Sequence, residues 1–228
     1  MRKTSRTASQ TKRPRAALKA LYARLYAAWG TQHWWPGETP FEVMVGAILT
    51  QNTAWTNVEK AIGNVKAAGM LEAEALRTAP LAKVADLIRP SGYFNVKARR
   101  LRHFLEFLHR EGGEAGLRAL PPRELREKLL SVNGLGPETA DSILLYALDR
   151  SVFVIDAYTR RVLRRHRLIR GDEDYEEVRA LFEEHLPRRR RLYNEYHALF
   201  VRVGKYHCRP KARCEGCPLA CFPHDARR

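Results

Sequence analysis

The chain has 228 residues, enough for one large domain or two smaller ones with a hydrophobic core. Lys and Arg number 41 against 25 Asp and Glu, and the formal net charge of +16 favours a polyanionic partner: DNA, RNA or an acidic membrane surface. No apolar run approaches the roughly 20 residues that span a membrane, which argues against an integral membrane protein.

The N-terminus, MRKTSRTASQTKRPR, is basic, and no apolar segment follows it, so it does not have the pattern of a secretory signal. We expect a disordered basic arm over residues 1–13. The first predicted helix, residues 15–30, ends at Gly30. The next, residues 40–51, is almost entirely apolar and has Pro40 at a first-turn position, which predicts a buried helix.

Helical periodicity continues along the rest of the chain. Thr53 is placed like a helix cap. Only RSVFVID alternates with period two, and it is too short and isolated to build a sheet. The sequence therefore predicts an all-α protein of about ten helices, without repeats or long linkers. Beyond the first two, helices are expected over residues 53–69, 80–90, 95–113, 121–132, 137–148, 157–168, 174–186 and 191–208.

The stretch NGLGPETADSILLYAL, residues 133–148, has the pattern of a tight turn that opens a helix. Gly134 and Gly136 permit backbone angles and close approaches that a side chain would forbid. Pro137 suits a first helical position, and Glu138 then lies near the positive end of the helix. Backbone N–H groups at such a turn can bind a phosphate, whereas the alternative is an ordinary connection between helices. With the basic charge of the chain, the pattern favours DNA binding.

All four cysteines lie within the last 21 residues, in the spacing C-x5-C-x2-C-x3-C. A bunched set of thiols in a chain without a secretory signal indicates a metal-binding loop in a reducing compartment, and two disulfides are the alternative. Four thiolates suit either a zinc ion or a [4Fe–4S] cluster, and the spacing alone does not separate the two. The candidate ligands are Cys208, Cys214, Cys217 and Cys221.

These motifs, in this order, resemble the helix–hairpin–helix superfamily of DNA glycosylases, and in particular the relatives of endonuclease III. The segment FEVMVGAILTQNTAWTNVEKAI resembles the family's base-access helix pair, and the cysteines after HALFVRVGKYHC resemble its iron–sulfur loop. The resemblance spans about residues 34–221 and implies two helical lobes with DNA and the extruded base in the cleft between them.

The resemblance also implies the limits of the lobes. One lobe is expected over residues 36–150, with the hairpin at about 125–148. The other combines residues 14–35 with residues 151–228 and ends in the iron–sulfur loop at 208–221.

Two departures from the family pattern carry information. Asp156 matches the catalytic aspartate, but Glu138 stands where bifunctional members have the lysine that attacks the sugar. A carboxylate cannot form the Schiff base that lyase chemistry requires. The family commonly shows C-x6-C-x2-C-x5-C, so the cysteine loop here is shorter in two intervals. A [4Fe–4S] cluster remains the expected cofactor, with zinc as the alternative.

Within the superfamily, the sequence looks most like the branch that removes 3-methyladenine. The residues expected to border the base pocket are Trp34, Trp35 and Trp55, although each could instead be a packing aromatic. Gln51, with Asn52, is expected to fill the gap left by the flipped base; a helix-end cap is the alternative. The hairpin residues expected at a DNA phosphate are Gly134, Leu135, Gly136 and Thr139.

The sequence thus predicts a monofunctional glycosylase that hydrolyses the N-glycosidic bond of alkylated purines such as 3-methyladenine. A glycosylase for oxidised pyrimidines or mismatched bases, and a catalytically weak DNA-binding homologue, remain as alternatives. The expected partner is double-stranded DNA with damaged bases, bound by a monomer in the cytoplasm at the nucleoid, with no membrane involved.

Overall fold

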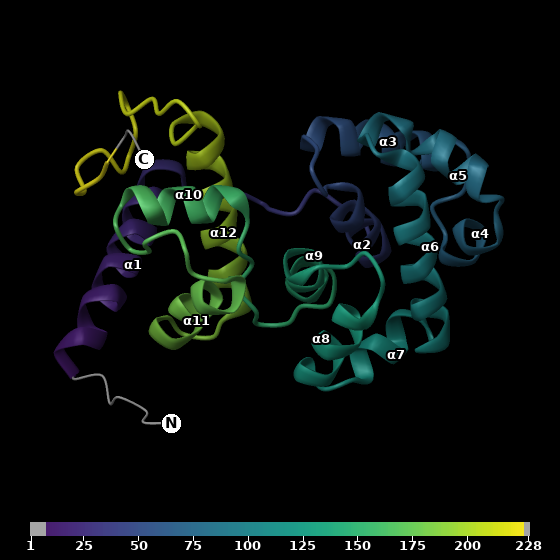
Figure 1. Cartoon of the computed structure of the whole chain (residues 1–228), viewed down its shortest axis with the longest axis horizontal. Coiled ribbons are helices and arrows are strands. Elements are labelled where there is room, and N and C mark those ends of the chain that lie inside the picture. The colour runs from purple at the N-terminus through teal and green to yellow at the C-terminus, as the bar shows by residue number, and fades with distance from the viewer. Residues whose placement is uncertain (1–7, 226–228) are drawn as a thin grey trace. The chain divides into compact units, whose positions relative to one another are not determined.

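The computed structural model describes residues 8–225, and in that range it contains twelve α-helices, one 3₁₀ helix, one π-helix and no strand (Figure 1). The expected all-α class is therefore confirmed for the described residues. The chain divides into two compact units, Met1–Trp34 with Ser151–Arg228, and Trp35–Arg150. The predicted division between the lobes, after residue 35, lies one residue from the division after Trp34. None of the helices in residues 8–225 is long and apolar enough to cross a membrane.

The continuous unit, Trp35–Arg150, is built around α2. Residues 42–49 of this helix are buried, and it packs against α3, α6 and the π-helix. The Thr39 side chain accepts a hydrogen bond from the Glu42 N–H at 3.1 Å, and Pro40 follows as the first helical residue. The elements of this unit are α2 (Pro40–Leu49), α3 (Trp55–Ala67), α4 (Ala73–Thr78), α5 (Leu81–Leu87), the 3₁₀ helix η1 (Arg89–Ser91), α6 (Phe94–Arg110), α7 (Gly113–Ala119), α8 (Pro122–Ser131), α9 (Pro137–Ser142) and the π-helix η2 (Ile143–Ala147).

The other unit joins the first helix to the last third of the chain. Helix α1 packs against α11 and α12, and α10 packs against α12. Its core is aromatic: Phe153 stacks on Phe182 with ring centroids 3.8 Å apart, and Tyr196 stacks on Phe200 at 4.6 Å. The elements are α1 (Ala8–Trp29), α10 (Ala157–Arg165), α11 (Tyr175–His185) and α12 (Arg190–Tyr206).

The structure corrects the sequence prediction at four places. Helices α4 and α7 were not predicted, because six or seven residues show too little of a helical period to be recognised. Thr53 is not the cap of α3, since the cap position is Ala54. The predicted arm ended at residue 13, but α1 begins at Ala8 and continues through Pro14, although proline usually ends a helix. Residues 1–7 of the arm lie outside the described residues.

Candidate functional site

The hairpin consists of α8, a turn, α9 and the π-helix, and its two glycines differ. Gly134 has φ +94°, and a Cβ there would lie 2.3 Å from Cγ of Arg100, so neither the backbone nor the packing admits a side chain. Gly136 is exposed, with φ −91°, and a Cβ there would meet no atom within 4 Å. The second glycine therefore leaves open space beside the N-terminus of α9, where no side chain caps the helix.

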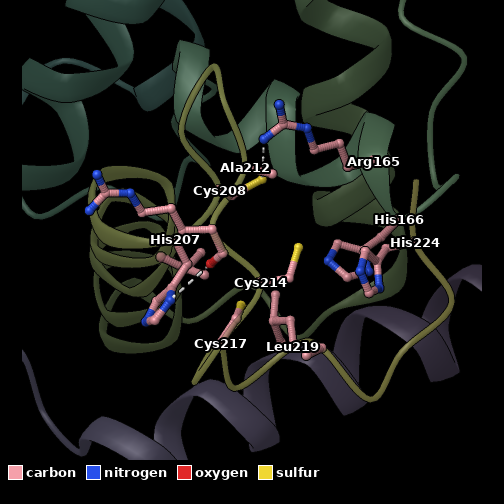
Figure 2. A pocket seen from close by; sticks show the side chains of 12 residues that line it. Arg165, His166, His207, Cys208, Ala212, Cys214, Cys217, Leu219 and His224 are labelled. Atoms are coloured by element: carbon pink, nitrogen blue, oxygen red, sulfur yellow. Dashed lines mark hydrogen bonds between the residues drawn. The ribbon is translucent and has the colours of Figure 1, made fainter. Parts of the chain in front are cut away.

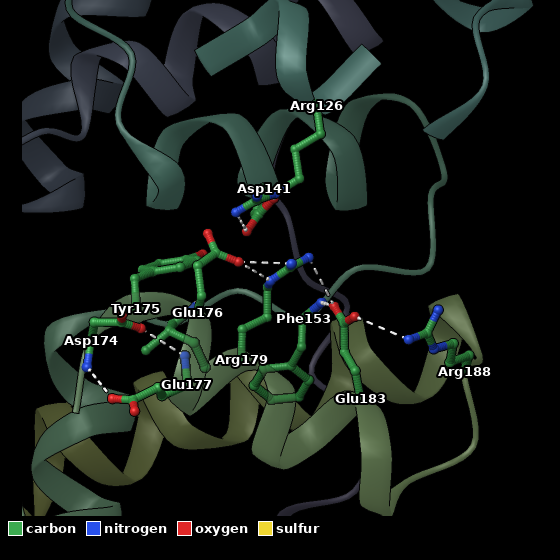
Figure 3. Close-up of polar contacts among 11 residues, drawn as sticks. Arg126, Asp141, Phe153, Asp174, Tyr175, Glu176, Glu177, Arg179, Glu183 and Arg188 are labelled. Carbon is green, nitrogen blue, oxygen red and sulfur yellow. Dashed lines mark hydrogen bonds and ion pairs between the residues drawn. The ribbon is translucent and has the colours of Figure 1, made fainter. Parts of the chain in front are cut away.

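An ion pair joins the two helices of the hairpin. Nε of Arg126 donates to Oδ1 of Asp141 at 2.7 Å, and Nη2 donates to Oδ2 at 3.1 Å (Figure 3). Asp141 is fully buried, so the pair fixes α8 against α9 in a low-dielectric environment.

Gln51, predicted to fill the gap of a flipped base, is bound to the hairpin. Its Nε2 donates to the carbonyl of Gly134 and to Oγ1 of Thr139, both at 3.0 Å, and its Oε1 accepts from Arg100. These bonds tie the end of α2 to the hairpin turn, and Gln51 would have to release them to enter a duplex. Asn52 is exposed and has φ +52°.

The remaining predicted phosphate-binding residues can contribute only through the backbone. The side chains of Leu135 and Thr139 are both buried, at 6% exposure each. Any hydrogen bond from these two residues to DNA would therefore come from their main-chain N–H groups.

Two of the three predicted pocket tryptophans lie together. The ring centroids of Trp35 and Trp55 are 5.0 Å apart in an edge-to-face arrangement, and that of Tyr146 is 4.9 Å from that of Trp35. Trp34 belongs to the other compact unit. Tyr146 was missed because it lies on the π-helix, a change of helical register that the apolar sequence does not reveal.

Asp156 is the N-cap of α10. Its Oδ1 accepts from the N–H of Thr159 at 2.7 Å, and its Oδ2 lies 3.5 Å from Nε2 of His197 on α12. Burial by itself would raise the pKa of Asp156, but His197 and the hydrogen bonds from Thr159 outweigh it and hold the pKa below its usual value. The carboxylate, 9% exposed, is thus stabilised in its ionised form inside the protein.

The segment that leads to Asp156 is held by α11. The Phe153 N–H donates to Oε1 of Glu183 at 3.0 Å, and the Ile155 N–H donates to the Tyr175 hydroxyl at 3.3 Å. Arg179 orients Glu183 from the other side, at 3.4 Å (Figure 3). These contacts satisfy backbone groups that form no helix or strand, and they fix the direction from which the chain enters α10.

Sequence reasoning missed both residues that hold Asp156. Thr159 had a usable signal, because the side chain of an N-cap residue binds the N–H two or three positions later. His197 had none, since it comes from a distant helix and only the packing of α12 against α10 brings it near.

The cysteine loop places three of its four thiols around one pocket. Cys208, Cys214 and Cys217 line it, while Cys221 is exposed and outside the lining (Figure 2). Burial first, and then the neighbouring thiols, raise the pKa of Cys217. All four thiols are free, so the predicted alternative of two disulfides is not found.

Within residues 8–225, no His, Cys, Asp or Glu side chains form a group of three or more arranged to hold a metal. The predicted set of four ligands is therefore not assembled: Cys221 is outside the pocket that the other three cysteines line, and those three are not arranged as a metal site. Thiols nevertheless suit an iron–sulfur cluster or zinc in kind, and three already share one pocket, so the residues fit such a group.

Two arginines of α10 hold the start of this loop. Arg161 donates to the carbonyls of Cys208 and Gly204, the latter at 3.1 Å. Arg165 is 4% exposed and donates to Sγ of Cys208 at 3.2 Å and to the carbonyl of Arg209 at 2.6 Å. The helix that Asp156 caps therefore also anchors the first cysteine.

Comparison with known proteins assigns this arrangement to a family. The chain is 47% identical over 205 residues to a protein of Methanocaldococcus jannaschii, MJ1434, whose name assigns it provisionally to DNA repair glycosylases; the match covers 89% of this chain and 93% of that one. Helicobacter pylori 3-methyladenine DNA glycosylase (MagIII), solved with 1,N6-ethenoadenine, is 30% identical with a TM-score of 0.67, over 86% of this chain and 97% of that one.

A non-covalent complex of endonuclease III with DNA has a TM-score of 0.79, covers 93% of this chain and 96% of that chain, and is 19% identical, which supports the fold. Residues 45–188 match the HhH-GPD superfamily of base excision DNA repair proteins. The chain therefore belongs to the HhH-GPD superfamily and is a DNA repair glycosylase.

Proposed function

We propose that this protein is a monofunctional DNA glycosylase that hydrolyses the N-glycosidic bond of alkylated purines such as 3-methyladenine. The observation that carries the proposal is the pair of residues at the family's two reactive positions. Asp156 is a buried carboxylate whose pKa is lowered by its surroundings. Glu138, at the position of the lyase lysine, is an exposed carboxylate that offers no amine to the sugar.

The reaction follows from the state of Asp156. A damaged nucleotide is flipped out of the duplex. As the bond between C1′ and the base nitrogen breaks, its electron pair leaves with the base and the sugar acquires positive charge. The ionised carboxylate of Asp156 stabilises that charge and accepts a proton from the water that bonds to C1′. The products are free base and an intact abasic site.

The neighbours of Asp156 explain why it can perform this role while buried. The Thr159 N–H holds Oδ1, and His197 lies beside Oδ2. Fixed donors around a carboxylate keep it ionised without a water shell, and they need not reorganise as charge develops on the sugar. We assign both residues the role of positioning Asp156.

The proposed substrate class rests on two supports. MagIII is named as a 3-methyladenine DNA glycosylase, and it is 30% identical to this chain. Trp35, Trp55 and Tyr146 form an aromatic cluster, and electron-rich rings suit the positive charge of an N3- or N7-alkylated purine. Trp34, which belongs to the other unit, stays a prediction as a residue of the base pocket.

Binding of double-stranded DNA is proposed to use the hairpin, with main-chain N–H groups around Gly134 and Gly136 at a phosphate. We propose Gln51 and Asn52 for the vacancy left by the flipped base. Asn52 is already exposed, whereas Gln51 would exchange its bonds to the hairpin for bonds to the orphaned base.

We further propose that the four cysteines hold a [4Fe–4S] cluster, with zinc as the alternative. Such a group would crosslink the loop as a structural element. The ligands would be Cys208, Cys214 and Cys217 from the common pocket, with Cys221 as the fourth. Purified protein should be brown and contain iron and labile sulfide, whereas colourless protein with one zinc per chain would contradict the cluster.

The decisive experiment is a panel of duplexes, each with one lesion, assayed for base release with and without alkali. Release of 3-methyladenine that leaves alkali-labile but uncleaved strands is expected. Strand cleavage without alkali, or a covalent adduct trapped by borohydride in good yield, would contradict monofunctional hydrolysis. Faster release of an oxidised pyrimidine or a mismatched base would replace the proposed substrate class.

A further inference from the structure

Helix α10 carries a second feature besides Asp156: a pocket lined with guanidinium groups. It has a volume of about 460 Å³ and lies entirely within the unit that contains α10. We call it the arginine pocket and define it by Arg160, Arg161, Arg164, Arg165, Gly171 and Pro210.

Three of the arginines in this pocket lack a carboxylate partner in the part of the chain that the structure describes. Among residues 8–225, Arg160, Arg161 and Arg164 form no ion pair with a carboxylate; Arg160 donates instead to the carbonyl of Glu173 at 2.9 Å. A carbonyl satisfies a hydrogen bond but leaves the charge in place. On α11, by contrast, Arg179 pairs with Glu176 at 2.7 Å.

The pocket is also organised in advance. Arg161 is held by the carbonyls of Cys208 and Gly204. Arg165 is held by Sγ of Cys208 and by the carbonyl of Pro210, the latter at 2.7 Å. Arg164 is exposed and lies against Gly171, where a Cβ would approach its Cδ to 3.0 Å and its Nε to 3.1 Å. Gly171, with φ +111°, therefore leaves the space that Arg164 occupies.

The location of the pocket indicates which anion it receives. Ala157 lines it and directly follows Asp156 in the chain. A helix rises about 1.5 Å per residue, so Arg160 and Arg164 are about 6 Å apart along α10. One strand of duplex DNA carries a phosphate about every 3.4 Å along the axis, so the spacing of the two arginines corresponds to about two phosphate steps along one strand.

We propose that the arginine pocket binds backbone phosphates of the strand that carries the damaged nucleotide, next to the sugar whose positive charge Asp156 stabilises. This inference rests on the proposed function. Guanidinium groups bind phosphate oxygens through two parallel N–H bonds, so the pocket would hold the strand in register while the base is flipped. Arg160 and Arg164 are the phosphate ligands, and Arg161 and Arg165 hold the cysteine loop beside them.

The experiment measures the affinity for an undamaged duplex as a function of salt concentration. Arg160→Ala with Arg164→Ala should reduce the slope of log K against log[salt] by about 1 to 2, since each neutralised phosphate contributes about 0.9. The matched control removes two exposed arginines of the other unit, Arg110→Ala with Arg123→Ala, and should change the slope less. Equal slopes for the two double variants would overturn the proposal.

A second variant separates a loss of DNA binding from a loss of folding. Arg164→Glu reverses one exposed charge that makes no hydrogen bond within the described residues, and it should weaken duplex binding about tenfold at low salt with unchanged thermal unfolding. Unchanged duplex affinity in this folded variant would overturn the proposal.

A third arm identifies the source of the phosphate. Inorganic phosphate and deoxyadenosine monophosphate are titrated by calorimetry against wild type and the Arg160/Arg164 double variant. Tight binding of either probe, lost in the variant while the salt slope for DNA is unchanged, would assign the pocket to a small anion and overturn the proposal. Because these measurements use undamaged duplex, a reduced slope would support the pocket even if no lesion were excised.

Discussion

The N-cap residues of α9 and α10 have almost the same backbone angles, but only the N-cap of α10 has a side chain that caps its helix. Gly136, the N-cap of α9, has φ −91° and ψ 176°, and Asp156, the N-cap of α10, has φ −103° and ψ 178°. The glycine is exposed and provides no side chain to cap its helix. The aspartate is buried and caps its own helix through the Thr159 N–H.

The difference shows how one local geometry can serve two purposes. A helix N-terminus attracts negative charge wherever it lies. At α9 the cap position has no side chain and the space beside it is open, so an anion from outside can approach, and we propose a DNA phosphate. At α10 the anion is built in, and we propose that it also acts on the sugar.

The largest effect is expected for Asp156→Asn, which tests whether the N-cap of α10 acts through its charge. Asparagine caps a helix as well as aspartate does, so α10 keeps its cap and loses only the charge. Base release under single-turnover conditions should fall on the order of 10²-fold or more. Asp174→Asn, at the N-cap of α11, is the matched control and should leave the rate unchanged. A near wild-type rate for Asp156→Asn would show that the charge is not needed.

The next largest effect is expected at the ion pair between Arg126 and Asp141, which holds α9 against α8. Asp141→Asn should lower the free energy of unfolding on the order of 3 kcal/mol, because Arg126 loses the negative charge of Asp141 at a buried position. Glu127→Gln, which breaks the exposed pair with Arg123, should cost less than about 1 kcal/mol. Urea titrations measure both. Similar losses in the two variants would mean that burial adds nothing to the hairpin ion pair.

A smaller effect is expected at the open helix end. Gly136→Val places a side chain where the structure has room, so folding should be unaffected while an approaching phosphate is obstructed. Losing a charge-assisted hydrogen bond should weaken duplex binding about tenfold, equally for damaged and undamaged DNA. Fluorescence anisotropy measures this. A loss confined to damaged DNA would mean that the turn reads the lesion.

Gly134→Ala is the companion to that variant. It should destabilise the fold, since φ is +94° and Arg100 occupies the space of the new methyl group. The two glycines of one short motif therefore separate binding from stability. If Gly134→Ala unfolded no more readily than wild type, the close packing of Arg100 would not be a constraint.

These residues also show what the sequence could and could not predict. The hairpin was predictable because it depends on local chemistry: two glycines, a proline and a following apolar helix. Asp156 as an N-cap was equally local, since the cap and Thr159 are neighbours in the chain. Pro40 and the apolar α2 likewise predicted a buried helix correctly.

What escaped prediction depends on packing between distant segments. Nothing near Gln51 in the chain indicates that its amide binds Gly134 and Thr139. The approach of His197 to Asp156 has the same origin, because it requires α12 to lie on α10. Tyr146 reaches the aromatic cluster because residues 143–147 form a π-helix, and nothing in the residue pattern ILLYA predicts a π-helix.

The smallest effect is expected for His197→Gln, which changes the surroundings of the Asp156 carboxylate and leaves the carboxylate itself in place. With His197 removed, burial is opposed only by Thr159, so the pKa of Asp156 should rise. The reactive form is the carboxylate, and activity is lost as pH falls through that pKa. The acid limb of the pH–rate profile should therefore move to higher pH, with a reduction of a few-fold at neutral pH or less.

The same shift has a signature in stability, because a carboxyl with a lowered pKa stabilises the folded state above its unfolded pKa and loses that contribution as pH falls through the folded one. In His197→Gln this loss should begin at higher pH than in wild type. His185→Gln, on α11, is the control and should move neither curve. If His197→Gln lowered the rate equally at every pH, the histidine would merely support the packing of α12. A displaced acid limb would mean that the histidine sets the charge of Asp156, so the capped helix end depends on a partner that the open one at Gly136 does not require.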